Sequence, residues 1–308
     1  MKTRAFLKIN TTKELSLQLG LPEVFLLRIA DHIGHCYKKF IDKDKKGKER
    51  IFYKANNDLK KIQRKINKLL DTLEYPINIQ GGIIGRSIYT NASIHSGKKY
   101  VANLDIKNFF PSVKFRTVYR AFQMQNCAPD VSRILTRLTT ADTALPQGFA
   151  TSPKISSLIL LNVNRRLNIL FKKYALVHTF WIDDLTISGD HPIKKFQKLL
   201  NKIFLQEGFK LHDDPKKTKF TSSEERQVCT GLVINQEPNA EKSVREKIRK
   251  ELYLCAKFGV ANYLEKRDIQ VEKEKYLMSM RGKISFLTAA NKKNMIFEEQ
   301  FAKLMVNY

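Results

Sequence analysis

Residues 180–189 read FWIDDLTISG, two adjacent aspartates with apolar residues typical of β-strands on both sides. Carboxylates within a buried apolar stretch cost free energy unless a partner neutralises them. An oxygen-preferring divalent cation such as Mg²⁺ would be a suitable partner for Asp183 and Asp184. The stretch therefore predicts a strand–turn–strand hairpin with a metal site, although an exposed Asp-Asp turn of an ordinary hairpin fits the same residues.

A third carboxylate follows another predicted strand. Residues 99–104 have a strand pattern that ends at Asp105, and a tight aromatic turn then leads into a predicted helix at 115–126. Taken alone, Asp105 also fits a turn or helix-capping aspartate. Together with the pair at 183–184 it gives three carboxylates from two strands, which can hold two Mg²⁺ ions for phosphoryl transfer.

The chain contains a second acidic pair, Asp213-Asp214, which we do not assign to the metal site. Pro215 and two lysines follow it directly, which predicts a loop. Its carboxylates can be solvated there or paired with the neighbouring lysines.

Composition indicates a folded protein that binds a polyanion. The 308 residues are 43% hydrophobic and carry a formal net charge of +26. Such an excess favours nucleic acid as a partner. No apolar run of about 18 residues predicts a membrane span, and the N-terminus lacks a signal-peptide pattern. The four cysteines are scattered without metal-binding spacing, so we expect reduced thiols and a cytoplasmic location.

The N-terminal part contains a helical segment, a lysine-rich hairpin and a glycine run. We expect helices in residues 1–33, and then a hairpin in 34–54 whose Lys48 and Arg50 are candidate phosphate ligands. A solvated basic face is the alternative for the loop lysines. The run GGIIG at residues 81–85 predicts a close backbone approach to a ligand or a turn, but its spacing is not that of a phosphate-binding P-loop.

Residues 145–153 read LPQGFATSP and predict a turn followed by a helix that runs to about residue 173. Ser152 is placed to cap that helix and Pro153 to begin it, so its N-terminus could face a phosphate. Gln147 is a neutral hydrogen-bond donor at the turn.

The C-terminal part predicts strands and then basic helices. Strand patterns occupy residues 217–220 and 227–235. Helices are expected at 241–258, 268–287 and 292–306, and the tail that contains them, residues 240–308, carries fifteen Lys/Arg against nine Asp/Glu. We interpret these helices as a basic subdomain that binds the phosphate backbone of a nucleic-acid duplex.

The order of these motifs resembles that of the reverse transcriptases. The matching segments are Asp105 with Phe109-Phe110 (motif A), Leu145–Gly148 with Ser152-Pro153 (motif B), Ile182-Asp183-Asp184 (motif C), Lys217–Phe220 (motif D) and Thr230-Gly231-Leu232, the strand leading into the thumb. Within that superfamily the chain is most similar to bacterial retron reverse transcriptases. The retron features are the Asn-Ala-x-x-His pattern at 91–95, the Cys229-Thr230-Gly231 triplet and the short length. One departure is Trp181, where these enzymes usually have tyrosine.

The resemblance implies an α+β, right-hand polymerase fold with fingers, a palm whose antiparallel sheet is backed by helices, and a helical thumb. It divides the chain into an N-terminal helical cover (1–33), fingers (34–98), a palm (99–235, with a finger insertion at about 115–150) and a basic thumb (236–308).

The resemblance also implies Mg²⁺-dependent, RNA-directed DNA synthesis on a noncoding RNA, primed from an RNA 2′-hydroxyl. The product would be a branched RNA–DNA hybrid, made in antiphage defence with an effector protein. The implied metal ligands are Asp105, Asp183 and Asp184. The implied dNTP contacts are Lys48, Arg50, the steric gate Phe110, Gln147, and Lys217 or Lys219. The implied RNA contacts are Asn91, His95, Thr230 and Gly231.

Two alternatives remain at this point. One is another bacterial reverse transcriptase, related to group II introns or diversity-generating elements. The other is an RNA-binding protein on a polymerase fold that has lost catalysis. The short chain and the pattern at 91–95 disfavour the first, and the three carboxylates disfavour the second.

Overall fold

A computed structural model describes residues 5–43, 47 and 49–306. The chain forms two compact units: the first comprises Met1–Arg86, Ala102–Ile187 and Pro192–Phe220, and the second Ser87–Val101, Ser188–His191 and Thr221–Tyr308. Helices and strands are mixed, which confirms the expected α+β class. Within the described ranges, no helix combines the length and apolar character needed to cross a bilayer.

The first unit begins with the predicted helices, α1 (Thr12–Leu19) and α2 (Glu23–Asp31). The Thr11 hydroxyl accepts a hydrogen bond from the Glu14 amide and caps α1. An amphipathic helix, α3 (Asn57–Leu70), begins after an asparagine cap and buries its apolar side.

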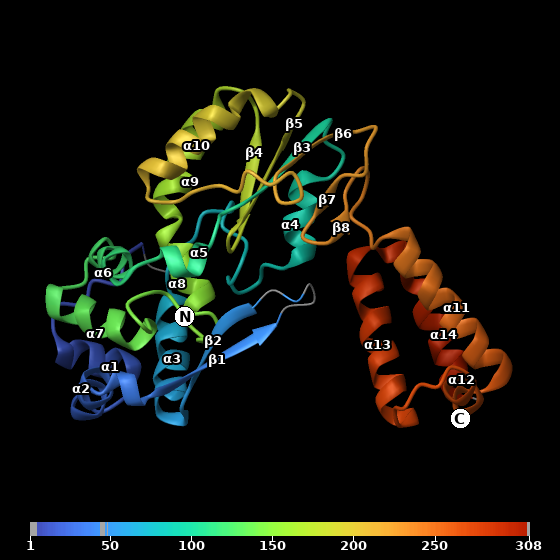
Figure 1. The fold of residues 1–308 in the computed structure, drawn as a ribbon, viewed down its shortest axis with the longest axis horizontal. Helices are drawn as coiled ribbons and strands as arrows, with labels where there is room; N and C mark the ends of the chain where they lie inside the picture. The colour runs from blue at the N-terminus through green and yellow to red at the C-terminus, as the bar shows by residue number, and fades with distance from the viewer. Residues whose placement is uncertain (1–4, 44–46, 48, 307–308) are drawn as a thin grey trace. The chain divides into compact units, whose positions relative to one another are not determined.

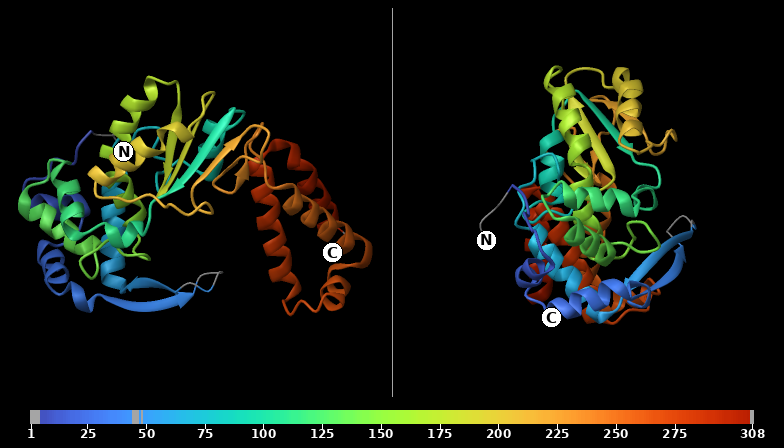
Figure 2. Two further views of the ribbon diagram at one scale, coloured as in Figure 1. Left: turned by 45° about the horizontal axis from the view of Figure 1, so that its top comes forward. Right: turned by 90° about the vertical axis from the view of Figure 1, so that its left-hand side faces the viewer.

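A long antiparallel hairpin precedes α3. It consists of β1 (Tyr37–Lys43) and β2 (Glu49–Ala55), with Lys39 opposite Tyr53 and Asp42 opposite Arg50. Both views show it as a two-stranded ribbon (Figures 1 and 2). Most of its side chains are exposed, so little burial holds it in place along its length.

A four-stranded sheet carries the motifs of the predicted palm. Its strands are β3 (Tyr100–Asp105), β4 (Val177–Trp181), β5 (Asp184–Gly189) and β6 (Lys219–Ser222), in the order β4-β5-β3-β6. Helix α9 (Leu161–Lys172) packs against β4, and α10 (Gln197–Gln206) packs beside α9 (Figure 1). Because β3 and β5 are neighbours, the end of β3 lies beside the turn before β5.

The helices between β3 and β4 are α5 (Phe109–Ser112), α6 (Phe115–Gln123), α7 (Pro129–Thr139) and α8 (Ser152–Ile159), followed by α9. The single helix expected from 153 to 173 is therefore two helices. The Ser156 and Ser157 hydroxyls donate to backbone carbonyls one turn back, an arrangement that bends helices. The expected cap is also wrong, because Ser152 is the first helical residue and donates to the Pro146 carbonyl.

The second unit contains α4 (Ile88–His95), β7 (Val228–Cys229), β8 (Leu232–Val233), α11 (Lys242–Phe258), α12 (Val260–Lys266), α13 (Lys273–Ala290) and α14 (Met295–Val306). The single strand expected at 227–235 is instead a hairpin. Thr230 and Gly231 both have positive φ, 45° and 83°, the conformation of a two-residue hairpin turn.

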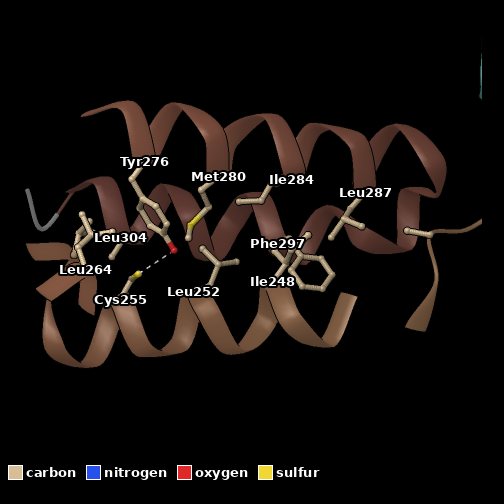
Figure 3. Close-up of a cluster of buried hydrophobic side chains, with 12 residues drawn as sticks. Ile248, Leu252, Cys255, Leu264, Tyr276, Met280, Ile284, Leu287, Phe297 and Leu304 are labelled. Atoms are coloured by element: carbon tan, nitrogen blue, oxygen red, sulfur yellow. Dashed lines mark hydrogen bonds between the residues drawn. The ribbon is translucent and has the colours of Figure 1, made fainter. Parts of the chain in front are cut away.

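The C-terminal helices share one apolar core. Residues from α11, α13 and α14 meet in it, among them Leu252, Met280 and Phe297 (Figure 3). At one end of the core the Cys255 thiol lies 4.0 Å from the Tyr276 hydroxyl. All four cysteines are buried and unpaired by disulfides, as their scattered spacing predicts.

Candidate active site

The Asp-Asp stretch forms the turn of the β4–β5 hairpin. Ile182 and Asp183 are the two turn residues, and Asp184 begins β5. Ile182 has a φ of 59°. A β-branched residue rarely adopts this conformation, and such strain persists where the surroundings hold the backbone in place.

The glycine run supplies those surroundings. The amides of Gln80 and Gly81 both donate to the Phe180 carbonyl, at 2.8 and 3.1 Å, and the Gly81 carbonyl accepts the Ser157 hydroxyl at 3.0 Å. A Cβ on Gly81 would overlap the Ile182 amide nitrogen and lie 2.9 Å from Ile182 Cγ1. The close approach predicted for this run is therefore an approach to the Asp-Asp turn.

Asp105 lies beside the same turn. The amide of Ile106 donates to the Asp183 carbonyl at 3.2 Å, which joins the end of β3 to the turn. Asp105 is buried, Asp183 is half-buried and Asp184 is exposed. The structure thus brings together the three carboxylates that the sequence predicts.

The two turn carboxylates have raised pKa values. Burial raises the pKa of Asp183, as does the charge of Asp105, against the opposing charges of Lys217 and Arg50. Although the Asp184 side chain has exposed surface, the protein atoms packed around its carboxylate desolvate it and raise its pKa to about 6, with further contributions from Asp183 and Asp105. Negative charge is therefore concentrated here beyond what the surrounding residues neutralise.

Lys217 brings a positive charge into contact with the carboxylates. Its Nζ forms an ion pair with Asp105 Oδ2, and this hydrogen bond is the largest cause of its raised pKa. Lys219 lies on β6 and is exposed. Of the two lysines expected at the pyrophosphate, Lys217 is the one that contacts the carboxylates.

The donor set suits Mg²⁺, although the described part of the chain contains no group of three His, Cys, Asp or Glu side chains already arranged as a metal site. Mg²⁺ commonly uses one or two carboxylates and completes its shell with water and substrate phosphates. The mutually repelling carboxylates, with one held by a lysine ammonium, fit a site that a divalent cation completes.

The expected nucleotide-binding residues lie in the same unit. Phe110 is half-buried at the start of α5, edge-on to Phe109 with ring centroids 5.6 Å apart. Gln147 is half-buried, and its backbone carbonyl accepts a hydrogen bond of 2.8 Å from the Tyr53 backbone amide. Arg50 is exposed on β2, and its charge lowers the pKa of Asp183. Lys48 lies outside the described residues.

The residues expected to contact RNA are corrected in part. Asn91 and His95 are completely buried, with Asn91 donating to Cys229 Sγ and His95 hydrogen-bonded to Ser188 at 2.7 Å. A side chain without exposed surface cannot touch an RNA, so these two residues stabilise the second unit instead. Thr230 donates to the Ile88 carbonyl, which leaves the exposed Gly231 turn as the accessible part of the set.

The carboxylate pKa values predict how pH and Mg²⁺ affect stability. A carboxyl whose pKa is raised binds more protons in the folded than in the unfolded state, so it destabilises the metal-free fold as pH rises from about 4 to about 6. We expect metal-free Asp184→Asn to melt about 2 °C above the parent at pH 7.5, with no gain at pH 4. Mg²⁺ should raise the parent's Tm more at pH 7.5 than at pH 4.

Differential scanning calorimetry with and without Mg²⁺ measures these shifts. Asp213→Asn is the matched control, because that exposed carboxylate has a lysine partner in a loop. A metal-free Asp184→Asn that melts below the parent at pH 7.5 would contradict the electrostatic account.

Comparison with known proteins agrees with this geometry. Residues 41–287 match the family described as reverse transcriptase (RNA-dependent DNA polymerase). The Retron Se72 reverse transcriptase of Salmonella heidelberg is 33% identical over 82% of this chain and 69% of its own length. The Retron Mx162 reverse transcriptase of Myxococcus xanthus is 28% identical over 74% of this chain and 54% of its own length. The Retron Ec86 reverse transcriptase of Escherichia coli is 32% identical over 63% of this chain and 62% of its own length.

The matched region thus spans between 54% and 69% of these relatives' own lengths. The family match covers the sheet, the Asp-Asp hairpin and most of the C-terminal helices. Together with the three carboxylates at the hairpin, these matches establish that the chain belongs to the reverse transcriptases, the RNA-directed DNA polymerases, and among them to the retron reverse transcriptases.

Proposed function

We propose that the protein copies part of a structured noncoding RNA into DNA, starting from a 2′-hydroxyl of that RNA. The product is a branched RNA–DNA hybrid, and we assign it to antiphage defence in the cytoplasm with a partner effector protein. The juxtaposition of Asp105 with the Asp183-Asp184 turn, in a chain similar to retron enzymes, carries the proposal.

The chemistry is transfer of a nucleotidyl group. The priming hydroxyl oxygen forms a bond to the α-phosphorus of a dNTP, the bond to the β-phosphate oxygen breaks, and the hydroxyl proton passes to solvent. Two Mg²⁺ ions held by the three aspartates would supply charge stabilisation for the attacking and leaving oxygens. Lys217 turns from Asp105 to the leaving pyrophosphate and donates a proton to it.

The other residues bind and select the nucleotide. Arg50 contacts the triphosphate, and its charge already acts on Asp183. Gln147 lines the pocket from the loop before α8. Phe110, five residues beyond Asp105, fills the space that a ribose 2′-hydroxyl would need.

The parts of the fold take the roles of a right-hand polymerase. We assign residues 34–98 to the fingers, 99–235 to the palm, including a finger insertion at about 115–150, and 236–308 to the thumb, with 1–33 as an N-terminal cover. The excess of basic residues in the C-terminal helices suits contact with a duplex backbone. The exposed Gly231 turn is the site we assign to RNA contact.

Sequencing the nucleic acid that copurifies with the protein tests the proposal. We expect a DNA strand joined to one RNA species through a 2′–5′ linkage, with the junction cleaved by a debranching enzyme. The same preparation of Asp183→Asn should contain the RNA without DNA. Recovery of unselected cellular RNA from both proteins would contradict the retron reaction.

The steric role of Phe110 predicts a change in sugar selectivity. Phe110→Ala opens the space beside the 2′ position, so we expect the preference for dNTPs over rNTPs to fall by about a hundredfold. Single-nucleotide incorporation with dNTP and rNTP pairs measures the ratio of kcat/KM values. Phe110→Tyr keeps the ring and should retain selectivity; equal loss in both variants would refute the steric explanation.

A further inference from the structure

Asp142 lies in the turn between Ala141 and Ala144 and binds the β1–β2 hairpin, which is distant from it in sequence. The sequence does not indicate this contact. Its carboxylate accepts hydrogen bonds from the hydroxyls of Tyr37 and Tyr53, at 3.0 and 2.9 Å, and from Lys39 Nζ at 3.3 Å. The Asp142 amide also donates to the Tyr37 hydroxyl at 3.2 Å. Three side chains from β1 and β2 thus converge on one carboxylate.

The backbone that presents Asp142 is strained. Asp142 and Thr143 have φ values of 46° and 65°, and Ala141 and Ala144 exchange backbone hydrogen bonds of 3.0 and 2.9 Å across them. This is a two-residue turn with positive φ at both positions. Aspartate tolerates that conformation, but threonine rarely adopts it, so surrounding contacts must hold the turn.

A second contact joins the hairpin to the loop that carries Gln147. The Tyr53 amide donates to the Gln147 carbonyl at 2.8 Å. Gly148 has a φ of 109°, and a Cβ there would overlap the Tyr53 carbonyl oxygen. The Tyr37 ring packs edge-on against buried Phe149, with centroids 5.7 Å apart. The hairpin is therefore fixed both to the Asp142 turn and to the loop after it.

The hydrogen bonds around Asp142 persist over the working pH range. Burial acts to raise its pKa, but the hydrogen bonds from Tyr53, Tyr37 and Lys39 hold it below the ordinary value. Burial, followed by the bond to Asp142, raises the pKa of Tyr53 to about 12, and burial raises that of Tyr37. The carboxylate stays ionised and both phenols stay protonated near neutral pH.

This attachment matters because of what the hairpin carries. Arg50 lies three residues from Tyr53 on β2, opposite Asp42 and on the other face of the strand. Side chains of the outer hairpin are exposed, including Phe40 at 45% and Ile41 at 62%. The contacts of Tyr37 and Tyr53 at the base therefore govern where the strand places Arg50.

We propose that Asp142 is a positioning residue for nucleotide binding. Its hydrogen bonds to Tyr37 and Tyr53, which we call the Asp142 clasp, hold the hairpin in place. Arg50 on the hairpin and Gln147 on the adjoining loop can then act on one triphosphate. The inference rests on the proposed function, because it takes Arg50 to bind the dNTP. Asp142 acts through the position of the strand and does not itself touch the substrate.

A double-mutant cycle tests the clasp. Loss of a hydrogen-bonded carboxylate should misplace Arg50, so we expect Asp142→Ala to raise the KM for dNTP about tenfold while kcat changes less than twofold. In an Arg50→Ala background, adding Asp142→Ala should leave KM nearly unchanged. The measurement is primer extension on an RNA template over a range of dNTP concentrations.

Asp130→Ala is the matched control, since Asp130 has an exposed ion pair with Arg133 and does not bind the hairpin. It should leave KM at the parent value. A tenfold rise from Asp142→Ala in both backgrounds, or a fall in kcat with KM unchanged, would overturn the proposal.

Hydrogen exchange separates the clasp from the proposed function. The Tyr53 amide should exchange faster in Asp142→Ala and at the parent rate in Asp130→Ala; unchanged exchange in Asp142→Ala overturns the clasp. An unchanged KM in Arg50→Ala would instead overturn the assignment of Arg50, while exchange still decides whether Asp142 fixes the hairpin.

Discussion

Replacing both turn aspartates, Asp183→Asn with Asp184→Asn, should lower dNTP incorporation by about a thousandfold or more. The charge of Asp105 acts on both carboxylates, and together they concentrate the negative charge that a divalent cation would balance. Asparagine keeps nearly the same shape but removes the charge. The loss should therefore appear in the rate of a single turnover at saturating Mg²⁺ and dNTP.

The chain offers a matched control for this experiment. Asp213-Asp214 is a second acidic pair, in an exposed loop. Asp213→Asn with Asp214→Asn removes the same formal charge but leaves Asp105, Asp183 and Asp184 in place, and should incorporate dNTP within about twofold of the parent. Equal loss in both double variants would mean that total charge, and not the metal site, explains the effect.

The binding of RNA separates catalysis from recognition. Because the C-terminal helices and the Gly231 turn are unchanged, the Asp183→Asn, Asp184→Asn protein should bind structured RNA with the parent's Kd. Normal binding without synthesis would assign the turn to chemistry. Synthesis at the parent's rate would show that our metal-ligand assignment is wrong.

The sequence predicts the candidate site well where the relevant signals are local. An acidic pair between two apolar strands and a third aspartate after another strand can be recognised from the residue pattern. The strand order then brings Asp105 beside Asp183, because β3 and β5 are neighbours in the sheet. Motif D predicts two candidate lysines for the leaving pyrophosphate, and of these Lys217 forms an ion pair with Asp105.

Local signals do not reveal partners that are distant in sequence. Asp142 looks like an ordinary turn residue, and its tyrosine partners lie 89 and 105 positions away. The burial of Asn91 and His95 is likewise set by packing within the second unit. A family pattern can mark such residues as important without distinguishing an RNA contact from an internal hydrogen bond.

The missed elements have physical explanations. Thr230-Gly231 is a turn because both residues adopt positive φ, which glycine favours but threonine does not, so the strand pattern around them hides the reversal. The break near Leu160 follows serine-to-backbone bonds that compete with regular helix geometry. At Thr230 a tertiary contact with the Ile88 carbonyl accompanies a backbone that local preference would not choose, whereas the bonds near Leu160 are local.

Gly81→Ala should lower the polymerisation rate by about a hundredfold without removing any catalytic group. The added Cβ overlaps the Ile182 amide nitrogen and lies 2.9 Å from Ile182 Cγ1 and 3.0 Å from the Trp181 carbonyl carbon. These atoms belong to Ile182 of the Asp-Asp turn and to Trp181, the residue of β4 directly before it. Relief of the overlap therefore displaces Asp183 relative to Asp105.

The glycine cannot relieve the overlap by moving away, because its own backbone is fixed on both sides. Its amide donates to the Phe180 carbonyl and its carbonyl accepts the Ser157 hydroxyl. Gly34→Ala is the control, since a Cβ there meets no atom within 4 Å and should leave activity unchanged. Single-turnover extension and circular dichroism together would show a slow but folded Gly81→Ala enzyme. Full activity in that variant would mean that the turn tolerates displacement, and that the strained Ile182 backbone is not what places the carboxylates.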